Sequence, residues 1–422
     1  MPNRSDAPPT APASARARRG SNLPRVADYN QMLVLDLVRR SAGISRVELV
    51  QHTGLTAQTV SNICRRLVDS AMIRESGRVH AGIGAPRTTL EVEPGGLYTN
   101  GLHIDPAWST AVVLNLAGEV TGVRTIPTPL SPEPASVLDE IATMIQALNA
   151  DSGVPADRLA GLGVGTPGPI DVRTGAVVGA PNLPGWERVP LKTDLERLLQ
   201  VPVTVDKDST AVAVGEMWNA QSGSDGPRNL AFLYIGTGIA AGLIANGEVM
   251  RGSSGNIAHM AADPNGPLCT CGGRGCLTAT LLPQHLVAEA TVRGVLPSVD
   301  IGNARALGTA LTELCRRADA DDPDAVEIIE RAARGLGRIA GQLANLLDLD
   351  TVVFGGPYWP LFEARFLRIV PDIVTRMFIG HALHPLTVRG TTIGDHVGAV
   401  GAASLAMWST TFDAPTRLFL PH

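Results

Sequence analysis

The residue pattern of this 422-residue chain changes once, at Gly95-Gly96, and this change constrains the fold more than any other feature. Before it, apolar residues recur at helical spacing and end in a predicted hairpin. After it, short apolar strands alternate with amphipathic helices, as in α/β folds built on a mixed sheet. The chain is also too long for one ordinary domain. We therefore predict a tail at residues 1–24, a small domain at 25–95 and a two-lobed α/β body at 96–422.

Charge is divided along the chain in the same way. Residues 1–90 hold 13 arginines and 6 acidic residues, a net +7, so the other 332 residues carry −12 of the overall −5. The tail has almost no large apolar side chains and is predicted to be disordered. Its Arg16, Arg18 and Arg19 could reach a DNA backbone, but a solvated tail is the simpler interpretation and we assign it no site. A basic head on an acidic body indicates nucleic-acid contact through the N-terminal part alone.

No apolar run in the chain has the length needed to cross a bilayer. The N-terminus also lacks the apolar core of a secretion signal. We expect a soluble cytoplasmic protein with no membrane partner.

Three helices are predicted in the N-terminal domain. The first covers residues 29 to about 41. The second follows Ser45, which can form a capping box with Glu48, and the third is capped by Thr56 and ends near Ala71. A tight turn containing glycine joins the second and third helices, as in a helix-turn-helix, whose last helix normally enters the major groove of DNA.

The exposed face of the third helix carries amide, hydroxyl and guanidinium groups, which can bond base edges and phosphates. A hairpin from Ile73–Glu75 to Leu90–Val92 follows and resembles a wing with a Gly-rich tip. This hairpin favours a winged helix-turn-helix over the alternative, an ordinary helical bundle with a polar surface. The predicted DNA contacts are Thr56, Gln58, Thr59, Ser61, Asn62, Arg65 and Arg66 on the helix, with Arg78 and Arg87 on the wing.

A metal site is predicted where three of the five cysteines, Cys269, Cys271 and Cys276, lie within eight residues. The clustering does not fit a disulfide framework, whereas the Gly-rich interval lets three thiolates reach one ion. His259 is the nearest preceding histidine, and a closed Cys₃His set is typical of structural zinc. The alternative is reduced cysteines packed as small apolar residues, but a Gly-rich loop offers little core for them.

Short motifs recur in a fixed order along the body, and their order is more informative than any one of them. They are Gly163–Asp171 (GVGTPGPID), Pro181–Trp186 (PNLPGW), Gly236-Thr237-Gly238, His259 with the cysteine cluster, Gly355-Gly356 and Gly398–Ala402 (GAVGA).

With the winged head, these motifs resemble the ROK family of repressors, open reading frames and sugar kinases, from Asn30 to about Met407. The resemblance implies an N-terminal winged helix-turn-helix followed by a two-lobed actin-like ATPase, or sugar-kinase-like, domain. It also implies zinc held by the same four ligands, His259 and the three clustered cysteines.

The sequence departs from the family's kinases where ATP phosphates should bind. Those kinases carry an Asp-x-Gly-Gly-Thr-Lys turn, and the matching stretch here is His103-Ile104-Asp105-Pro106-Ala107-Trp108. Proline removes an amide donor and Asp105 would repel phosphate. Although Gly236-Thr237-Gly238 is retained, we expect poor nucleotide binding and no enzymatic activity.

The sugar-binding residues have changed as well. The family's catalytic aspartate corresponds to Asp208, now beside Lys207, while two sugar-binding glutamates correspond to Asn256 and Thr278. This loss of acceptors and gain of a cation favour a phosphorylated or otherwise anionic sugar over a plain neutral hexose. The predicted effector class is therefore a sugar or sugar phosphate, bound between the lobes. An alternative is a relic pocket in a body that only dimerises. The predicted effector contacts are Gly168, Asn182, Lys207, Asp208, Asn256, His259 and Thr278.

The predicted function is that of a ligand-responsive repressor of carbohydrate-metabolism genes. A homodimer or homotetramer would hold two heads over an inverted-repeat operator in double-stranded DNA, and the effector between the lobes would change their spacing. Two alternatives stay open, a sugar kinase with an accessory DNA module and a regulator without a small-molecule effector.

Overall fold

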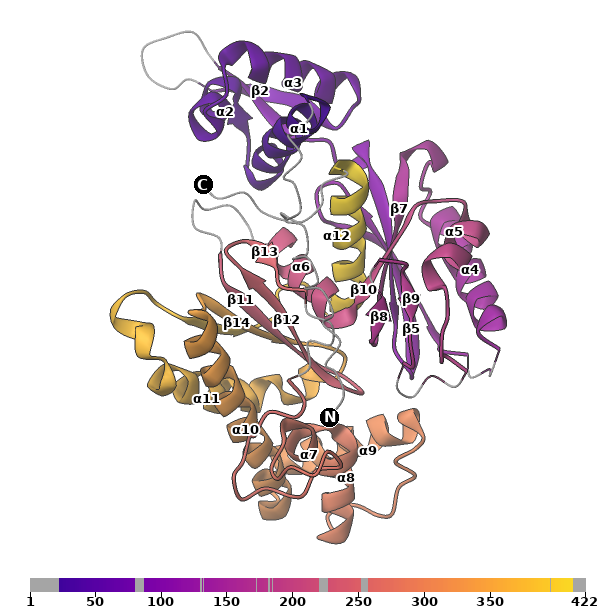
Figure 1. Cartoon of the computed structure of the whole chain (residues 1–422), viewed down its shortest axis with the longest axis vertical. Coiled ribbons are helices and arrows are strands. Elements are labelled where there is room, and N and C mark those ends of the chain that lie inside the picture. The colour runs from indigo at the N-terminus through magenta and orange to yellow at the C-terminus, as the bar shows by residue number, and fades with distance from the viewer. Residues whose placement is uncertain are drawn as a thin grey trace, which may run out of the picture.

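The computed structural model describes residues 23–79, 87–129, 131, 133–171, 173–180, 183, 185–219, 227–251, 257–394 and 396–412. A small head sits above two larger lobes (Figure 1). The predicted tail lies outside the described residues up to position 22, and helix α1 (Leu23–Arg40) starts two residues before the predicted domain boundary. No helix among the described residues combines the length and the apolar character needed to cross a membrane.

The head has the predicted three helices and hairpin, but α1 begins at Leu23, before the predicted start at residue 29. Ser45 and Glu48 form the predicted capping box, and the Thr56 side chain accepts a bond from the Thr59 amide. The helices bury apolar residues around Leu49 and Leu67, both with no exposed surface. The elements are α1, β1 (Ile44–Ser45), α2 (Arg46–Thr53), α3 (Ala57–Asp69), β2 (Ile73–Val79) and β3 (Arg87–Val92), with sheet order β1-β3-β2.

Each lobe contains a five-stranded sheet, and the two sheets have the same topology. In each, a central strand pairs antiparallel with the next strand and parallel with a later one. The first lobe, in the order β10-β7-β4-β5-β6, has β4 (Tyr98–Ile104), β5 (Trp108–Asn115), β6 (Val120–Pro127), β7 (Leu159–Thr166) and β10 (Val203–Lys207). The second, in the order β13-β12-β11-β14-β15, has β11 (Leu230–Ile235), β12 (Ile239–Ala245), β13 (Glu248–Val249), β14 (Thr351–Gly355) and β15 (Thr387–Gly390).

Two helices, α6 (Asp208–Asn219) and α12 (Val397–Phe412), pack on each other between the lobes (Figure 1). Helix α12 contacts the first sheet so closely that a Cβ on Gly163 would lie 1.7 Å from the Ala402 carbonyl oxygen. On the second sheet, a Cβ on Gly242 would lie 1.9 Å from the Ser209 carbonyl oxygen of α6. These glycines let the helices approach each sheet at backbone distance.

A buried carboxylate fixes α6 to the second lobe. The Glu216 side chain has no exposed surface and accepts bonds from Arg389 Nη2 at 2.9 Å and the Thr392 amide at 3.0 Å. The Thr391 hydroxyl also donates to Glu216. Because removing one partner of such a buried group is costly, α6 and the end of β15 are held in one arrangement.

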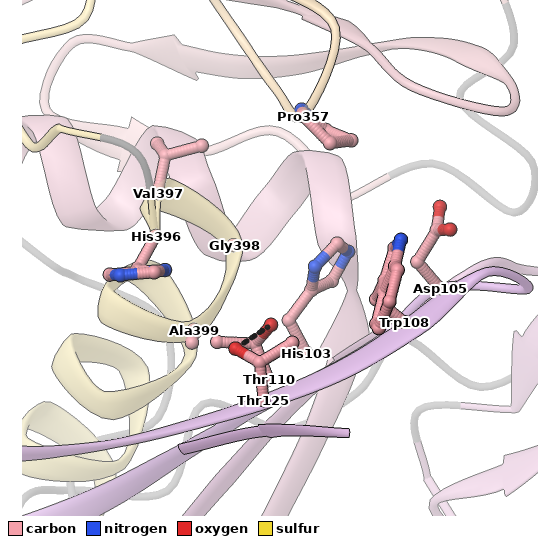
Figure 2. A pocket seen from close by; sticks show the side chains of 10 residues that line it. All are labelled: His103, Asp105, Trp108, Thr110, Thr125, Pro357, His396, Val397, Gly398 and Ala399. Carbon is pink, nitrogen blue, oxygen red and sulfur yellow. Dashed lines mark hydrogen bonds between the residues drawn. The ribbon is translucent and has the colours of Figure 1, made fainter. Parts of the chain in front are cut away.

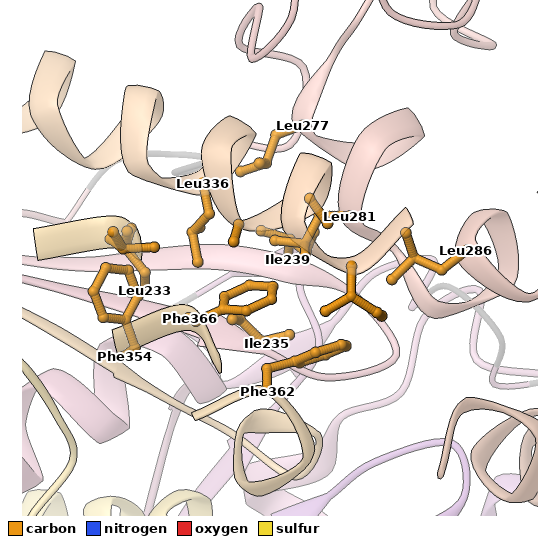
Figure 3. Packing of buried hydrophobic residues seen from close by; sticks show 14 of the residues in the cluster. Leu233, Ile235, Ile239, Leu277, Leu281, Leu286, Leu336, Phe354, Phe362 and Phe366 are labelled. Carbon is orange, nitrogen blue, oxygen red and sulfur yellow. The ribbon is translucent and has the colours of Figure 1, made fainter. Parts of the chain in front are cut away.

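Apolar side chains from strands and helices form the core of the second lobe (Figure 3). Leu233, Phe354, Phe362 and Phe366 have no exposed surface, and each contributes about 1.5–3 kcal/mol. The helices of this lobe are α7 (Leu277–Leu281), α8 (Pro283–Val292), α9 (Ala304–Asp319), α10 (Pro323–Leu347), α11 (Trp359–Met377) and the 3₁₀ turn η3 (Ile379–Ala382).

The first lobe is completed by short elements and two helices. Helices α4 and α5 pack on each other and contact strands of its sheet. These elements are η1 (Pro94–Gly96), α4 (Pro134–Asp151), η2 (Ala156–Arg158), β8 (Ile170–Asp171), β9 (Ala176–Val177) and α5 (Leu191–Leu199).

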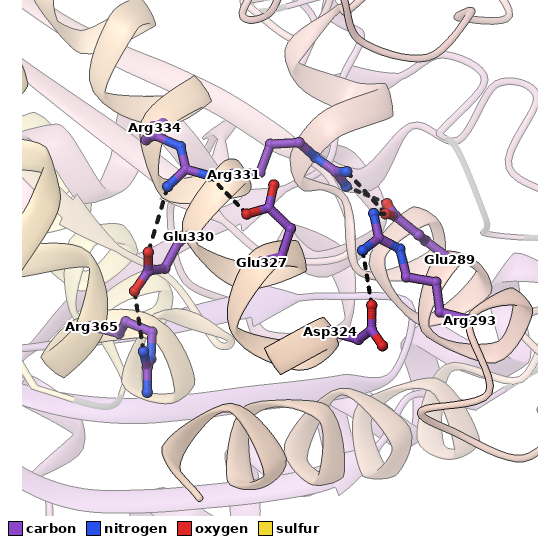
Figure 4. Close-up of polar contacts among 8 residues, drawn as sticks. All are labelled: Glu289, Arg293, Asp324, Glu327, Glu330, Arg331, Arg334 and Arg365. Carbon is purple, nitrogen blue, oxygen red and sulfur yellow. Dashed lines mark hydrogen bonds and ion pairs between the residues drawn. The ribbon is translucent and has the colours of Figure 1, made fainter. Parts of the chain in front are cut away.

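Ion pairs link the outer helices of the second lobe (Figure 4). Glu289 of α8 accepts from Arg331 of α10, and Arg365 of α11 lies 3.3 Å from Glu330 of α10. Partly exposed pairs contribute about 0–1 kcal/mol each, so this cluster is structural and we assign it no site.

Candidate DNA-reading face, metal centre and interlobe cleft

The reading face is the set of predicted contact residues on α3. Five of them are exposed, and Thr59 and Ser61 are half-buried. The Gln58 amide donates to Asn62 Oδ1 at 3.2 Å, which aligns two groups that can bond an adenine edge. On the wing, Arg87 is exposed and the Arg78 backbone pairs with Thr88, whereas the Arg78 side chain and the tip at 80–86 lie outside the described residues.

A residue that the sequence prediction missed, Arg46, lies beside the reading face. It lines a hollow of about 470 Å³ with Ser61, Arg65 and Val68, and its Nη2 lies 3.0 Å from Glu75 of β2. Arg46 is the first residue of α2, directly after the cap Ser45. A cation at this position faces the same side as Arg65, so it is a candidate phosphate contact.

The four predicted metal ligands converge. Their ligand atoms all lie within 4.8 Å of one another, with Cys269 Sγ 3.5 Å from His259 Nδ1 and Cys271 Sγ 3.6 Å from Cys276 Sγ. Zinc–sulfur and zinc–nitrogen bonds of about 2.3 and 2.0 Å would set tetrahedral ligand atoms about 3.5–3.8 Å apart. The donor set and spacing therefore fit one tetrahedral metal ion, and zinc suits these ligands.

Loop conformation brings the thiols together. Gly275 has a φ of +63°, and a Cβ there would lie 1.5 Å from the Asp263 carbonyl oxygen. The Cys271 amide holds the pKa of Cys269 down to about 6, whereas burial raises the pKa of Cys276 to about 11. Cys269 is therefore readily deprotonated to a thiolate, and a bound cation would favour deprotonation of Cys276.

The predicted effector residues lie in two groups. Gly168, Lys207 and Asp208 lie together, since a Cβ on Gly168 would be 3.2 Å from Lys207 Cδ. Thr278, on α7, lies close to the segment that holds His259. The Thr278 hydroxyl donates to the carbonyl of Ala258 at 2.8 Å. Asn182 and Asn256 lie outside the described residues.

The turns that follow the first strand of each sheet meet at the interlobe junction. The Thr237 hydroxyl of the second lobe donates to Asp105 Oδ2 at 3.1 Å, and the Ala107 amide donates to Asp105 Oδ1 at 2.9 Å. Asp105 is only 6% exposed. The Asp105 carboxylate therefore accepts hydrogen bonds from donor groups of both turns.

A second bond joins the lobes beside the first. His103 Nε2 and the Tyr234 hydroxyl are 3.1 Å apart and buried. His103 and Asp105 line a pocket of about 340 Å³ with Trp108, Pro357 and the start of α12 (Figure 2). Burial lowers the pKa of His103, so this bond is made by a neutral imidazole.

Asp208, near the junction, has a strongly raised pKa. Burial raises its pKa to about 7, and the charge of Asp105 adds to this rise. Its Oδ1 accepts the Ser209 amide at 2.6 Å, at the first residue of α6. A carboxylate with this pKa can accept a proton near neutral pH or bond a ligand hydroxyl in either form.

The fold and these sites define a winged helix-turn-helix protein with a two-lobed, sugar-kinase-like body. Residues 106–408 match the ROK family and residues 22–81 match the MarR family. The chain therefore belongs to the ROK family, with a MarR-type head.

Two relatives and one solved structure illustrate this family. The chain is 26% identical to the putative xylose repressor of Caldicellulosiruptor sp. strain Rt8B.4, over 90% of this chain and 96% of that one. It is 32% identical to the glucokinase of Halalkalibacterium halodurans, over 69% and 89% respectively. A ROK family transcriptional regulator, a homologue of the E. coli Mlc protein, shares the fold with a TM-score of 0.73 at 21% identity, covering 92% of this chain and 98% of that one.

Proposed function

We propose that this protein is a DNA-binding transcriptional repressor of carbohydrate-metabolism genes, controlled by a sugar or sugar phosphate between its lobes. The similarity to a relative named as a repressor extends over 90% of the chain, whereas the glucokinase similarity covers 69%. The exposed reading face on α3 supports DNA binding by this chain. In this proposal, residues 25–95, with the first two residues of α1, form the DNA-binding domain, and residues 96–422 form the effector and oligomerisation domain.

The observation that carries the proposal against catalysis is the placement of Asp105. Its carboxylate takes the Ala107 amide and the Thr237 hydroxyl, donors that would otherwise face a nucleotide phosphate. A bound phosphate would have to displace this carboxylate and would meet its negative charge. The protein therefore regulates without transferring phosphate.

Phosphoryl transfer is the second candidate function, because Asp208 has a pKa of about 7 and could accept a hydroxyl proton. We expect no ADP production with Mg-ATP and D-glucose or D-xylose in a coupled assay, and no ATP heat signal in titration calorimetry. Asp105→Gly frees both donors and removes a negative charge, so it should make ATP binding detectable in the same titration. Turnover by the unmodified protein would instead support a kinase.

Zinc and oligomer state complete the proposal. His259 and the three cysteines hold one structural zinc, which supplies a fixed tetrahedral crosslink rather than chemistry, because the closed set has no open position. A homodimer or homotetramer presents two heads to an inverted repeat in double-stranded DNA.

The effector is tested by fluorescence anisotropy on the promoter of the protein's own gene. D-xylose is the first probe, followed by glucose, glucosamine and their 6-phosphates. We expect salt-sensitive binding with a sugar-dependent shift. Specific binding that no sugar alters would favour a regulator without a small-molecule effector, and no preference over random duplex after a wider promoter selection would overturn the repressor function.

Two substitutions on the head should separate base contacts from phosphate contacts. Asn62→Ala removes an exposed amide of the reading face and should cost about 1–3 kcal/mol on the operator, with little effect on random DNA. Arg46→Ala should weaken binding to both and reduce the salt slope by about 1. Arg376→Ala is the control, since this exposed arginine pairs with Asp372 on α11 of the second lobe. Equal losses on both DNAs for Asn62→Ala would contradict its role in sequence recognition.

A further inference from the structure

An arginine of the head stacks on a tryptophan of the body. The Arg39 guanidinium of α1 lies 3.9 Å from the ring centroid of Trp218, near the end of α6, and the Arg39 side chain is only 6% exposed. The same guanidinium pairs with Asp36, with Arg39 Nη2 3.0 Å from Asp36 Oδ1. The Trp408 ring of α12 meets Trp218 edge-on at 6.3 Å and 83°. Helices α6 and α12 thus form the surface on which α1 rests.

The Trp218 ring is placed for this stack and not for a hydrogen bond. Its Nε1 is buried and has no hydrogen-bond partner among the described residues, whereas a buried indole N–H usually has one. A buried cation over an indole face is the stronger form of this contact. The apolar cores of the head and of these two helices are also continuous, from Leu35 and Leu67 to Met217 and Trp408.

A second contact holds the end of the reading helix. Arg158 Nη1 donates to the carbonyl of Ser70, the C-cap of α3, at 3.0 Å and to the Gly96 carbonyl at 3.3 Å. A cation at the carboxyl end of a helix is favoured by the helix dipole. The first lobe therefore contacts the DNA-reading helix directly.

The two contacts lie at the ends of α6 and β7. The opposite end of each element lies at or beside predicted effector residues. Helix α6 begins at Asp208 and reaches Trp218. Strand β7 starts directly after Arg158 and ends at Thr166, two residues before Gly168. Helix α6 packs on strands of both sheets, and β7 lies inside the first sheet and against α12. Close-packed elements of this kind can pass a displacement from one end to the other.

We infer that the Arg39–Trp218 stack and the Arg158–Ser70 bond are positioning contacts, which set the orientation of the DNA-reading head according to the state of the interlobe cleft. The inference rests on the proposed repressor function. Because coupling between two sites is reciprocal, DNA bound to the head must also act on the cleft ends of β7 and α6. That reverse effect can be measured without knowing the effector.

The test is amide hydrogen exchange of the full-length protein with and without operator DNA. In the unmodified protein we expect operator to change exchange rates at least about threefold in residues 162–168 and 208–214. Trp218→Leu and Arg158→Ala should each remove more than half of that change. Trp218→Phe, which keeps an aromatic face, and Arg124→Ala, which breaks a surface pair with Asp151 in the same lobe, should keep it.

Each outcome separates the inference from the proposed function. Two results would overturn the inference and leave the repressor function standing. In the first, operator binds but the exchange rates of residues 162–168 and 208–214 do not change. In the second, Trp218→Leu and Arg158→Ala show the same operator-induced change in exchange rates as the unmodified protein. Failure of the unmodified protein to bind any selected DNA would overturn both. Should Trp218→Leu fail to fold by circular dichroism, Arg158→Ala and Trp218→Phe still decide. A D-xylose shift in operator affinity, if present, should fall at least about threefold in both coupling variants.

Discussion

Cys276→Ser is expected to abolish zinc binding and to unfold the region around the metal loop. Cys276 is both a proposed zinc ligand and the N-cap of α7, whose Leu277 and Leu281 lie fully buried in the second-lobe core. Structural zinc contributes about 10–16 kcal/mol in small peptides, which is as large as the 5–15 kcal/mol stability of a whole domain. Metal analysis should fall from one zinc per chain to none, with a melting temperature lowered by about 10 °C or more.

The matched control for this prediction is Cys315→Ala. Cys315 is buried in α9, away from the ligands, and burial raises its pKa to about 12, as expected for a packed thiol. This variant should keep its zinc and lose only about 1 kcal/mol of stability. Zinc retained by Cys276→Ser, or lost equally by both variants, would contradict a site made of His259 and the three clustered cysteines.

Local patterns predicted the elements of the head. The capping box at Ser45 and the cap at Thr56 depend on neighbouring residues only, so the sequence reveals them. Strand β6 (Val120–Pro127) was missed because it lies at a sheet edge, where alternate positions are exposed and no apolar run is needed.

Contacts between residues far apart in the chain could not be predicted from the sequence. The cysteine spacing predicted the metal loop because its ligands are close in the chain. Arg39 and Trp218 are 179 positions apart, and Asp105 and Thr237 are 132 apart, so only the folded arrangement pairs them. Asp105 was predicted to repel phosphate from its charge, but its bond to the opposite lobe depends on both sheets meeting at their first turns.

Burial of Asp208 destabilises the folded protein at neutral and higher pH. Its pKa of about 7 lies well above the ordinary 3.8 because burial disfavours the charged form. Its folded-state pKa is raised, so the related stability is fully present below pH 3.8 and is lost as pH rises to about 7. The shift corresponds to about 4 kcal/mol at pH 8.

Asp208→Asn should therefore stabilise the protein at pH 8 by about 1–4 kcal/mol, with a smaller gain at pH 5.5, where the buried carboxyl is already protonated. Denaturant unfolding at both pH values measures this difference, and pH 5.5 limits protonation of the zinc ligands. Asp151→Asn, at an exposed surface pair, should leave the pH dependence unchanged. If Asp208 contacts the effector, the same variant should weaken sugar binding while operator binding without sugar persists. A gain in stability with unaltered sugar response would instead leave Asp208 as a remnant of the kinase ancestry.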